Sequence, residues 1–501
     1  MSLKETYAEV IAWYKEIWLV NSMNQVLSWD LQVNLPKKGL ERRSEQLAFL
    51  DGLVHRKMTD PAMVAKVGEL AAHSTALTAD GKVNIREIKR EVDRATKVPT
   101  ALVEEISRHN SQAQMAWIEA RQDNNYARFA PFLAKTVRLR KEEAAALGYA
   151  ERPYDAMLDL HEPFATEGSI RELLTDLKGR LVPFLQRILS APRYDARLLL
   201  AGRRYPIEKQ KKFSRLVLRK MGFDFEGGRI DVSAHPFCGG NKGDVRLTTR
   251  FFVDDPRPHL FGTIHEAGHG LYEQGLPDPH LGTPLGDAVS LGVHESQSRF
   301  WENIMGRSLS FWKYFYPKFQ RTFAKSLRDL SLENFYHCVN VVEPSLIRVE
   351  ADEVTYNLHI ILRFEIERAM VAGGVAIDDL PALWNAKMKE YLDIAVPDNT
   401  NGLLQDVHWS LGALGYFPTY TIGNLYAAQL WEKIRADIPD VLALVEKGRF
   451  TAILRWLRKN IHVHGKRYAG NELIERVTGK KPSAEPFMNY LDEKYTPLYR
   501  L

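Results

Sequence analysis

Cysteine is scarce in this sequence, and its scarcity limits the kinds of protein that the chain can encode. Only Cys238 and Cys338 occur among the 501 residues. Two thiols cannot form the disulfide framework that holds small secreted domains together, and such low cysteine use is typical of proteins from reducing compartments. We therefore expect the protein to work in the cytoplasm.

Long apolar runs are absent as well. A helix that spans a membrane needs roughly 18–20 consecutive apolar residues, and no stretch of the sequence reaches that length. The opening residues, MSLKETYAEVIAWYKEIWLV, carry acidic side chains within their apolar stretch and lack a small-residue cleavage site. The sequence therefore predicts neither a membrane partner nor a secretory signal.

The charge is too closely balanced for a typical nucleic-acid-binding protein. The formal net charge is +5, and the basic clusters lack the interleaved aromatic residues on which bases stack. Such clusters are typical of solvated helix faces, so we expect no nucleic-acid partner. The clusters comprise Arg203, Arg204, Lys209, Lys211 and Lys212, and then Arg455, Arg458 and Lys459.

Apolar residues at helical spacing are the dominant pattern in the sequence. In residues 101–122, Leu102, Ile106 and Met115 recur with charged residues between them, which predicts an amphipathic helix. Similar patterns fill the first two hundred residues and return after residue 288. No repeat, low-complexity segment or Pro/Gly-rich linker marks an independent domain. The sequence therefore predicts a single, mostly α unit.

Strand signals are rare. Residues 244–255 alternate apolar and mostly polar side chains, which predicts one strand. Upstream, GRIDVSAHPF and the glycine-rich residues 238–244 predict a first strand and a turn. A small sheet should therefore precede the segment 260–275, with Asp244, Arg246 and Thr248 in mainly structural roles.

The stretch LFGTIHEAGHGLYEQG (260–275) has the spacing of a metal site. In a helix, His265 and His269 lie one turn apart, so both imidazoles can reach the same cation. Glu266 lies about 100° around the helix from His265, where it could take a proton from water at the metal. Gly268 should keep the surface near the metal open. The spacing predicts a metal-dependent hydrolase. The alternative is that these residues occur at this spacing on a helix by coincidence.

A catalytic zinc site needs three protein ligands and an open position for water, so a third residue is required. Glu273 continues the helical series, but it lies roughly 12 Å along the axis from His265 and cannot share one ion with it. Residues 288–306 predict a second helix, in which Glu295 and Glu302 fall two turns apart on one face. Either carboxylate could bind the metal or lie on the surface, and spacing alone does not choose between them.

Several motifs resemble, in order along the chain, the signatures of the carboxypeptidase Taq family of thermostable metallocarboxypeptidases. They are His235-Pro236-Phe237, Asp244-x-Arg246-x-Thr248, His265-Glu266-x-x-His269, His294-Glu295-Ser296, Ile347-Arg348-x-x-Ala351-Asp352 and Gly402-x-x-Gln405-Asp406-x-His408-Trp409. The stretch VLSWDLQVNLPKKGLERRSEQLAFL (26–50) also resembles that family's opening, although NLPKKG departs from its usual methionine-proline with glycines. The similarity runs from about residue 10 to the C-terminus.

The resemblance implies a large helical, neurolysin-like peptidase fold, with two lobes around a deep groove and a small β-sheet beside the active site. It also implies Glu295 as the third metal ligand and, commonly, a homodimer. We expect one peptidase unit over residues 1–501. Its parts would be an N-terminal helical wall of the groove (1–225), a catalytic core (226–430) and a C-terminal helical part (431–501).

A carboxypeptidase must hold the free α-carboxylate of its substrate. A guanidinium suits this task because it is always charged and can bond both oxygens, and the resemblance gives the role to Arg348. From the residues alone, 347–370 predicts a helix on which Arg348, Ala351 and Thr355 share a stripe. An ion pair with Asp352 is the structural alternative, and such a pair could also orient Arg348 toward substrate.

An oxyanion forms when water attacks a peptide carbonyl, and it needs hydrogen-bond donors besides the metal. His408 and Tyr420 lie 12 residues apart across a glycine-rich stretch, and related helical metallopeptidases place a His and a Tyr at similar spacing. We expect both to donate to the oxyanion, with a groove-lining role as the alternative for Tyr420. Gln405 and Asp406 would position the loop. His235 could contact the substrate backbone or cap the small sheet.

The residues and the resemblance predict a zinc-dependent metallocarboxypeptidase of broad specificity, with Glu266 as general base. Cobalt could bind the same ligands. The alternatives are an oligoendopeptidase with the same metal site and a non-catalytic peptide-binding scaffold. Each metal-binding histidine also needs a partner for its other ring nitrogen; Asp287 and Glu302 are candidates that the sequence does not distinguish.

Overall fold

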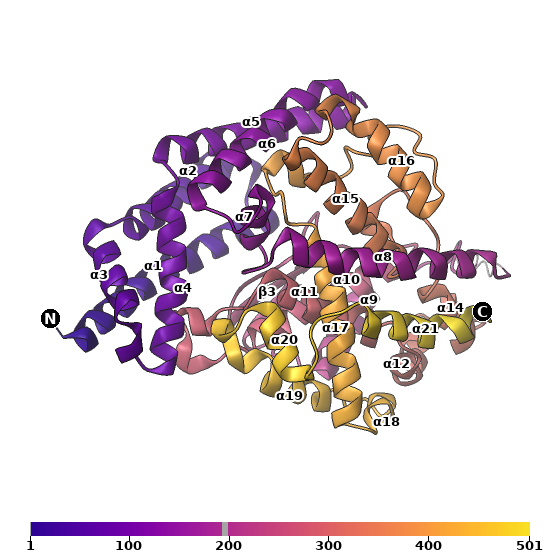
Figure 1. Cartoon of the computed structure of the whole chain (residues 1–501). Coiled ribbons are helices and arrows are strands. Elements are labelled where there is room, and N and C mark those ends of the chain that lie inside the picture. Colours follow the sequence, from indigo (N-terminus) through magenta and orange to yellow (C-terminus); the bar gives the residue numbers. More distant parts are fainter. Residues whose placement is uncertain (1, 193–198) are drawn as a thin grey trace. The chain divides into compact units, whose positions relative to one another are not determined.

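The computed structural model describes residues 2–192 and 199–501. Helices account for most of the described structure, and one small sheet accompanies them (Figure 1). The prediction of a mostly helical fold with a small sheet is therefore confirmed. Nowhere in the described part of the chain does a helix combine the length and the apolar character needed to traverse a bilayer.

The chain divides into two compact units, and each is built from separate stretches of sequence. The first comprises Met1–Thr96, Asp195–Val339 and Leu430–Lys481, and the second comprises Lys97–Tyr194, Asn340–Gln429 and Pro482–Leu501. The division of the peptidase into residues 1–225, 226–430 and 431–501 stays a prediction.

The helices of the first unit are α1 (Leu3–Val33), α2 (Leu40–Met58), α3 (Pro61–Ala72), α4 (Ala79–Lys97), α9 (Ile207–Met221), α10 (Arg257–Glu273), α11 (Leu291–Arg299), α12 (Leu309–Thr322), α13 (Ala324–Leu327), α14 (Leu332–Val339), α18 (Val441–Glu446), α19 (Thr451–Asn460) and α20 (Gly470–Thr478). Those of the second unit are α5 (Thr100–Gln122), α6 (Tyr126–Leu147), α7 (Pro153–Asp159), α8 (Glu167–Ser190), α15 (Thr355–Ala372), α16 (Leu380–Leu392) and α21 (Glu485–Tyr499). Helix α17 (Pro418–Asp437) contributes residues to both units. The helix predicted for 101–122 corresponds to α5.

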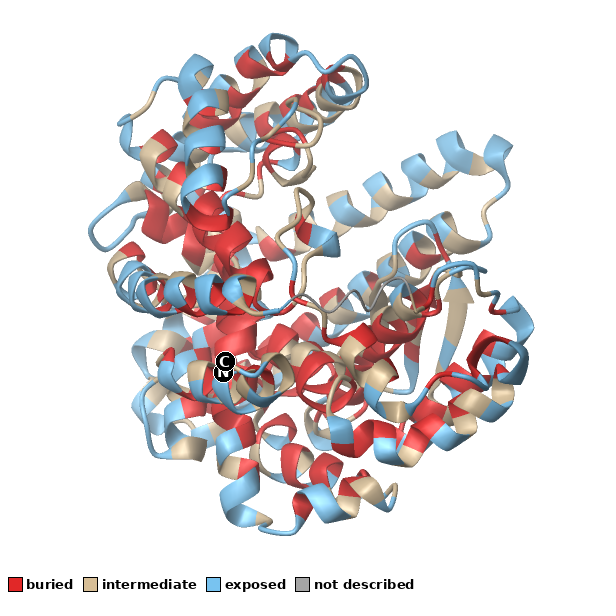
Figure 2. Ribbon diagram, turned by 90° about the vertical axis from the view of Figure 1, so that its right-hand side faces the viewer, coloured by how far each residue is buried: buried red, intermediate tan, exposed pale blue. Residues whose placement is uncertain are grey.

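Helix α1 illustrates how the sequence forms these elements. The Ser2 side chain accepts a hydrogen bond from the Glu5 N–H, and the Glu5 carboxylate accepts one from the Ser2 N–H, so the two residues cap the first turn. Val10, Tyr14 and Ile17 recur at helical spacing and pack in one buried cluster with residues of α3 and α4. The same separation of buried and exposed faces is visible on many helices in Figure 2.

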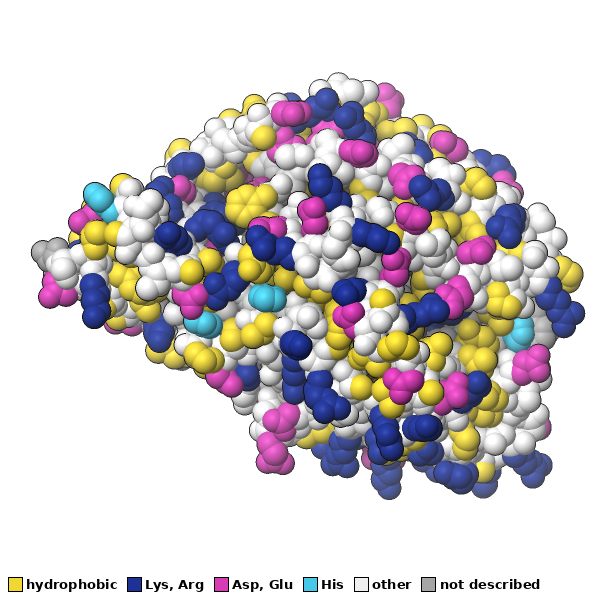
Figure 3. Space-filling view, turned by 60° about the horizontal axis from the view of Figure 1, so that its bottom comes forward, with side chains coloured by type: hydrophobic (Ala, Val, Ile, Leu, Met, Phe, Trp, Pro, Cys, Tyr) yellow, Lys and Arg dark blue, Asp and Glu magenta, His cyan; other side chains and the backbone are white. Residues whose placement is uncertain are grey.

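The basic residues near position 210 lie on the surface, as the solvated-face interpretation predicts. Helix α9 buries Phe213, Val217 and Leu218. Lys and Arg side chains gather toward the bottom of the face shown in Figure 3. The exposed basic residues of α9 are Lys209, Lys211, Lys212, Arg215, Arg219 and Lys220.

The sheet has three strands in the order β1-β3-β2. Strand β1 (Gly228–Val232) pairs in parallel with β3 (Asp244–Thr249), and β2 (Cys238–Asn241) pairs with β3 in the antiparallel direction. The sheet packs on α10, because a Cβ added at Gly270 would lie 3.0 Å from Leu247 and 3.2 Å from Val245. It therefore lies beside the helix that carries the predicted metal site.

Two details of the predicted sheet are wrong. The segment predicted as a turn at 238–244 contains β2; it lacks β-branched residues, and Gly240 adopts a φ of +89° where a Cβ would lie 2.0 Å from the Asp244 carbonyl oxygen. The strand predicted for 244–255 ends at Thr249. Beyond it, the Val253 carbonyl accepts from the Tyr205 N–H at 2.6 Å, so the chain has left the sheet.

The single helix predicted for 347–370 is also wrong. Arg348 lies in a separate short 3-10 helix, η6 (Arg348–Glu350), and α15 begins only at Thr355. The Asp352 carboxylate accepts hydrogen bonds from the N–H groups of Val354 and Thr355 and from the Thr355 hydroxyl. Asp352 therefore binds the chain just before α15, and Arg348 shares no helical stripe with Thr355.

Candidate active site

Helices α10 and α11 contact each other near the point where His265, His269 and Glu295 come together. A Cβ added at Gly268 would lie 2.6 Å from the carbonyl oxygen of Gln297 and 2.6 Å from the Cα of Ser298. Only a residue without a side chain lets two backbones approach so closely. The expected role of Gly268 is therefore wrong: it packs against α11 rather than leaving an open surface. This approach brings Glu295 to the two histidines.

His265, His269 and Glu295 form a cluster suited to one metal ion. Their ligand atoms all lie within 4.8 Å of one another. The Nε2 atoms of His265 and His269 lie 3.7 and 3.5 Å from the Oε2 atom of Glu295. Tetrahedral ligands about 2.0–2.2 Å from a zinc ion are separated by roughly 3.4 Å. The three residues therefore fit a divalent cation.

The Nδ1 atoms of His265 and His269 also have hydrogen-bond partners. Nδ1 of His265 lies 2.8 Å from the Oε2 atom of Glu302. Nδ1 of His269 donates to the carbonyl oxygen of His294 at 3.1 Å. Because both Nδ1 atoms are engaged, both Nε2 atoms remain for the ion, and each ring has a fixed orientation.

His294 connects this arrangement to Glu273. Its Nδ1 lies 2.5 Å from Nδ1 of His269, and its Nε2 lies 2.8 Å from Oε1 of Glu273. Since His269 carries its proton on Nδ1, His294 accepts there and donates from Nε2 to Glu273. Glu273 thus lies outside the cluster of His265, His269 and Glu295, and it contacts His269 only through His294. The other candidate partner, Asp287, lies 3.6 Å from Lys466 and forms no ion pair with His265 or His269 in the described part of the chain.

Glu295 is fixed by its own helix. The Nε atom of Arg299, one turn further on, donates to its Oε1 at 2.6 Å, and the Ser298 hydroxyl donates to its Oε2 at 3.0 Å. Burial raises the pKa of Glu295, but Arg299 and His265 outweigh burial and hold that pKa well below its usual range. The carboxylate is therefore ionised, the form in which a carboxylate can bind a metal.

Glu266 lies beside this cluster and is only 7% exposed. Burial, opposed by His265, raises the pKa of its carboxyl to about 7. Burial lowers the pKa of His265 itself, but Glu295 and Glu302 outweigh that effect and raise it to about 9. His265 must therefore lose a proton when it binds a metal.

Arg348 lies in the second unit and is only 5% exposed. Its Nε and Nη2 atoms donate to Oδ1 of Asp406 at 3.1 and 2.8 Å, and its Nη1 atom donates to the Tyr356 hydroxyl at 3.0 Å. The ion pair with Asp352, which was the structural alternative for Arg348, is wrong, because the Asp352 carboxylate accepts from the N–H groups of Val354 and Thr355 instead. Arg348 is instead oriented by a residue from a distant part of the sequence.

Asp406 joins two guanidinium groups. Its Oδ1 bonds Arg348, and its Oδ2 lies 2.6 Å from Nη2 of Arg363 on α15. Burial raises the pKa of Asp406, but the two guanidiniums outweigh burial and hold it far below its usual range. The group carries two positive charges and one negative charge, so a carboxylate that approached it would be attracted. The Gln405 side chain accepts from the Arg348 N–H at 2.9 Å and so helps to position the segment.

His408 and Tyr420 lie in the same unit as Arg348. Nε2 of His408 lies 3.3 Å from the Tyr420 hydroxyl, and the Arg348 guanidinium lies 5.1 Å from the centre of the Tyr420 ring. Burial is the largest influence on His408 and lowers its pKa to about 4, so the imidazole is neutral near pH 7. Four residues that the sequence singled out, Arg348, Asp406, His408 and Tyr420, thus come together.

This chain is similar to known proteins along almost its whole length. The family model described as carboxypeptidase Taq (M32) metallopeptidase matches residues 9–495. The chain belongs to the carboxypeptidase Taq (M32) metallopeptidase family. It is therefore a metallocarboxypeptidase, an enzyme that requires a divalent metal and acts on peptides.

Relatives of this M32 carboxypeptidase match over almost the whole chain. Thermostable carboxypeptidase 1 of Thermus thermophilus is 45% identical over 514 residues, with 100% of each chain covered. Carboxypeptidase 1 of Bacillus subtilis is 40% identical, with 95% of each chain covered. Among solved structures, the M32 carboxypeptidase of Deinococcus radiodurans has a TM-score of 0.95 at 38% identity, covering 99% of this chain and 100% of that one. The carboxypeptidase of Pyrococcus furiosus has a TM-score of 0.94 at 39% identity, covering 98% and 99%.

The remaining predicted residues lie at or near the sheet of the M32 enzyme. The His235 side chain is exposed, and its carbonyl oxygen accepts from the Ser233 hydroxyl at 2.6 Å. Arg246 forms an ion pair with Asp244 at 2.8 Å, and the Thr248 hydroxyl accepts from the Phe237 N–H at 2.8 Å. Asp244, Arg246 and Thr248 thus make structural contacts, as expected.

Several residues that contact the candidate site residues were not predicted from the sequence. Arg299 could have been found, because it lies four residues after Glu295, a spacing that favours an ion pair on a helix. The bonds from Arg363 to Asp406 and from His294 to Glu273 join separate elements. Periodicity carries no information about such contacts.

Replacing Glu302 by Gln tests the support of His265. The amide cannot supply the charged acceptor that faces Nδ1, so we expect the metal affinity of the enzyme to fall roughly 10–100-fold, measured by competition with a chelator. Asp287→Asn is the matched control, since this half-buried carboxylate pairs with Lys466 instead. Wild-type affinity in Glu302→Gln would contradict the role.

Gly268→Ala tests the contact between the helices. The added methyl group would meet the backbone of α11, so we expect the free energy of unfolding to fall by about 1–3 kcal/mol. Metal affinity should fall as well, because Glu295 moves with α11. Thermal unfolding and metal titration measure both effects. In the control Gly262→Ala on the same helix, the new Cβ meets no atom within 4 Å; similar losses in the two variants would refute the argument.

Proposed function

We propose that this metallocarboxypeptidase releases amino acids from the free carboxyl ends of peptides, with broad preference for the last side chain. The observation that carries the proposal is the convergence of two imidazoles and one carboxylate within 4.8 Å, with Glu266 next to them. This arrangement is expected for a hydrolase, whereas a peptide-binding scaffold has no use for it.

Zinc is the proposed metal. His265, His269 and Glu295 provide the nitrogen and oxygen donors that zinc prefers in catalytic sites, with a fourth position left open. Cobalt binds the same donor set and is the second choice. When bound, the ion supplies Lewis-acid activation of water and of the scissile carbonyl.

Glu266 is the proposed general base. It neighbours His265 in the sequence, lies outside the three-residue cluster, and is buried beside it. In this position it takes the proton from the attacking water and passes it to the nitrogen of the departing amino acid.

Arg348 is the proposed ligand of the substrate's α-carboxylate. Asp406 and Tyr356 take three of its five N–H groups, so within the described contacts one N–H remains on each terminal nitrogen. Two such donors suit the two oxygens of a carboxylate. The extra positive charge supplied by Arg363 favours the same ligand.

His408 and Tyr420 are the proposed donors to the developing oxyanion. The two side chains lie 3.3 Å apart, and an imidazole N–H and a phenol O–H are both capable donors. His235, whose side chain is exposed, is proposed to contact the substrate backbone.

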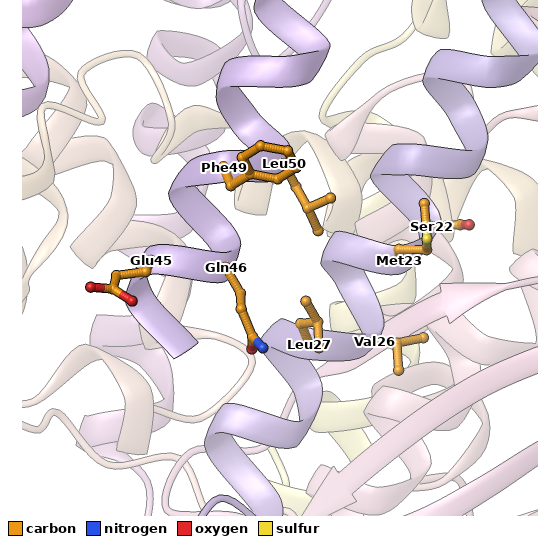
Figure 4. A pocket seen from close by; sticks show the side chains of 8 residues that line it. All are labelled: Ser22, Met23, Val26, Leu27, Glu45, Gln46, Phe49 and Leu50. Carbon is orange, nitrogen blue, oxygen red and sulfur yellow. The ribbon is translucent and has the colours of Figure 1, made fainter. Parts of the chain in front are cut away.

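We also propose that the enzyme forms a homodimer and works in the cytoplasm. Both cysteines are free thiols, which suits a reducing compartment. An apolar hollow lies between α1 and α2 (Figure 4), and Met23 and Phe49 beside it are 51% and 65% exposed. A second copy of the chain is the partner that the family resemblance favours for such a surface. The hollow is lined by Ser22, Met23, Val26, Leu27, Glu45, Gln46, Phe49 and Leu50.

Glu266→Gln separates catalysis from metal binding. The amide cannot accept the proton from water, so we expect kcat to fall roughly 100–10,000-fold. The metal content should stay at the wild-type level, because Glu266 is not among the three ligands. Activity assays together with metal analysis check both statements. Unchanged turnover would exclude the hydrolytic mechanism.

Arg348→Ala distinguishes a carboxypeptidase from an endopeptidase. We expect kcat/KM to fall roughly 10–100-fold on a peptide with a free carboxyl end, and to change far less on the C-terminal amide of the same peptide. Arg348→Lys retains the charge but not the paired donors. Its kcat/KM on the peptide with a free carboxyl end should therefore lie between the values of the wild type and Arg348→Ala. Equal losses on the acid and the amide would favour the endopeptidase.

A further inference from the structure

Glu367 on α15 is a buried carboxylate to which the proposed mechanism assigns no part. It is 0% exposed. Its Oε1 accepts from the Trp409 indole N–H at 2.7 Å, and its Oε2 accepts from the Tyr154 hydroxyl at 2.6 Å and the Gly415 N–H at 2.9 Å. Among the described residues, no Lys or Arg side chain lies within ion-pair distance of it. Three neutral donors therefore satisfy this carboxylate.

Two of the three donors belong to the segment that carries His408. Trp409 is its direct neighbour, and Gly415 follows at the end of the short loop after the 3-10 helix η8 (His408–Leu411). The third donor, Tyr154, lies on α7. A Cβ at Gly415 would lie 2.7 Å from the backbone of Met157, also on α7, so the end of the loop packs closely there. One carboxylate thus joins both ends of the loop to α7 and α15.

The same face of α15 holds the segment at a second point. Arg363 lies one helical turn before Glu367, and its guanidinium bonds Oδ2 of Asp406. Asp406 and Trp409 stand on either side of His408 in the sequence. The two anchors on α15 therefore limit how the His408 ring can move relative to the Tyr420 hydroxyl.

We propose that Glu367 is a positioning residue of the carboxypeptidase reaction, which fixes the loop 408–415 so that His408 presents its Nε2 edge to the reacting carbonyl. This inference rests on the proposed role of His408. A buried carboxylate is costly unless it is fully bonded, and two of the three donors that satisfy Glu367 come from the start and the end of the His408 loop.

The amide variant Glu367→Gln is a specific probe of this role. In either orientation of the amide, its NH2 group faces the Trp409 indole N–H or the Gly415 N–H, so one buried donor loses its acceptor. We expect kcat to fall roughly 10–100-fold, since small displacements of a catalytic group have large effects on rate. KM should change little, because the lost contact acts on the transition state.

Glu365 provides the matched control. It lies on the same helix and also accepts from three donors, the ammonium groups of Lys178 and Lys387 and the hydroxyl of Tyr391. These donors come from α8 and α16 and not from the His408 loop. Glu365→Gln should therefore cause a comparable loss of thermal stability and leave kcat at the wild-type value.

A double-mutant cycle with His408→Ala tests whether Glu367 acts through His408. If Glu367 acts through His408, Glu367→Gln lowers kcat in the wild type and has no further effect in His408→Ala. Equal losses in both backgrounds, or unchanged kcat in Glu367→Gln alone, overturn the proposal while leaving the role of His408 intact. Unchanged kcat in His408→Ala refutes the proposed role of that histidine, and with it the part assigned to Glu367. If Glu367→Gln does not fold, Trp409→Phe removes one loop anchor and is tested in the same cycle.

Discussion

The close approach of α10 and α11 at Gly268 is the contact on which the rest of the site depends. The two histidines lie on one helix and need only helical geometry to face the same point. The third proposed ligand, Glu295, comes from another helix, and its oxygen reaches 3.5–3.7 Å from the imidazoles because the two backbones touch where Gly268 has no side chain. Without this contact the chain would have two ligands on an exposed helix face, which is insufficient for a catalytic metal site.

Glu295 in the first cluster and Asp406 in the second are buried carboxylates that are held by guanidinium groups through charge and hydrogen bonds. In the first unit, Arg299 keeps Glu295 ionised. In the second, Asp406 is shared between two guanidiniums, which fixes Arg348 and leaves a positive charge for an anionic group. Buried charges that lacked such partners would lose their ionisation, and the side chains would no longer be suited to bind a cation or a carboxylate.

The features that could be predicted from the sequence are those set by local spacing or by several motifs in order. The helical character, the histidine pair and the choice of Glu295 are of this kind. The contact between Arg348 and Asp406 joins residues 58 positions apart, and no periodicity indicates it. The break before α15 depends on the Asp352 side chain accepting backbone N–H groups, a bond that competes with helix continuation. Strand β2 lacks the residue types that identify strands, and at Gly240 a glycine is required because φ is positive and a Cβ would meet the Asp244 carbonyl oxygen.

X-ray absorption spectroscopy at the zinc edge, on the enzyme reconstituted with one zinc ion per chain, tests whether His265, His269 and Glu295 share one ion. We expect two imidazole nitrogens and carboxylate or water oxygens at about 2.0–2.2 Å, and the loss of one oxygen neighbour or a change of geometry in Glu295→Ala. A sulfur neighbour at about 2.3 Å, or a spectrum without two imidazoles, would contradict it.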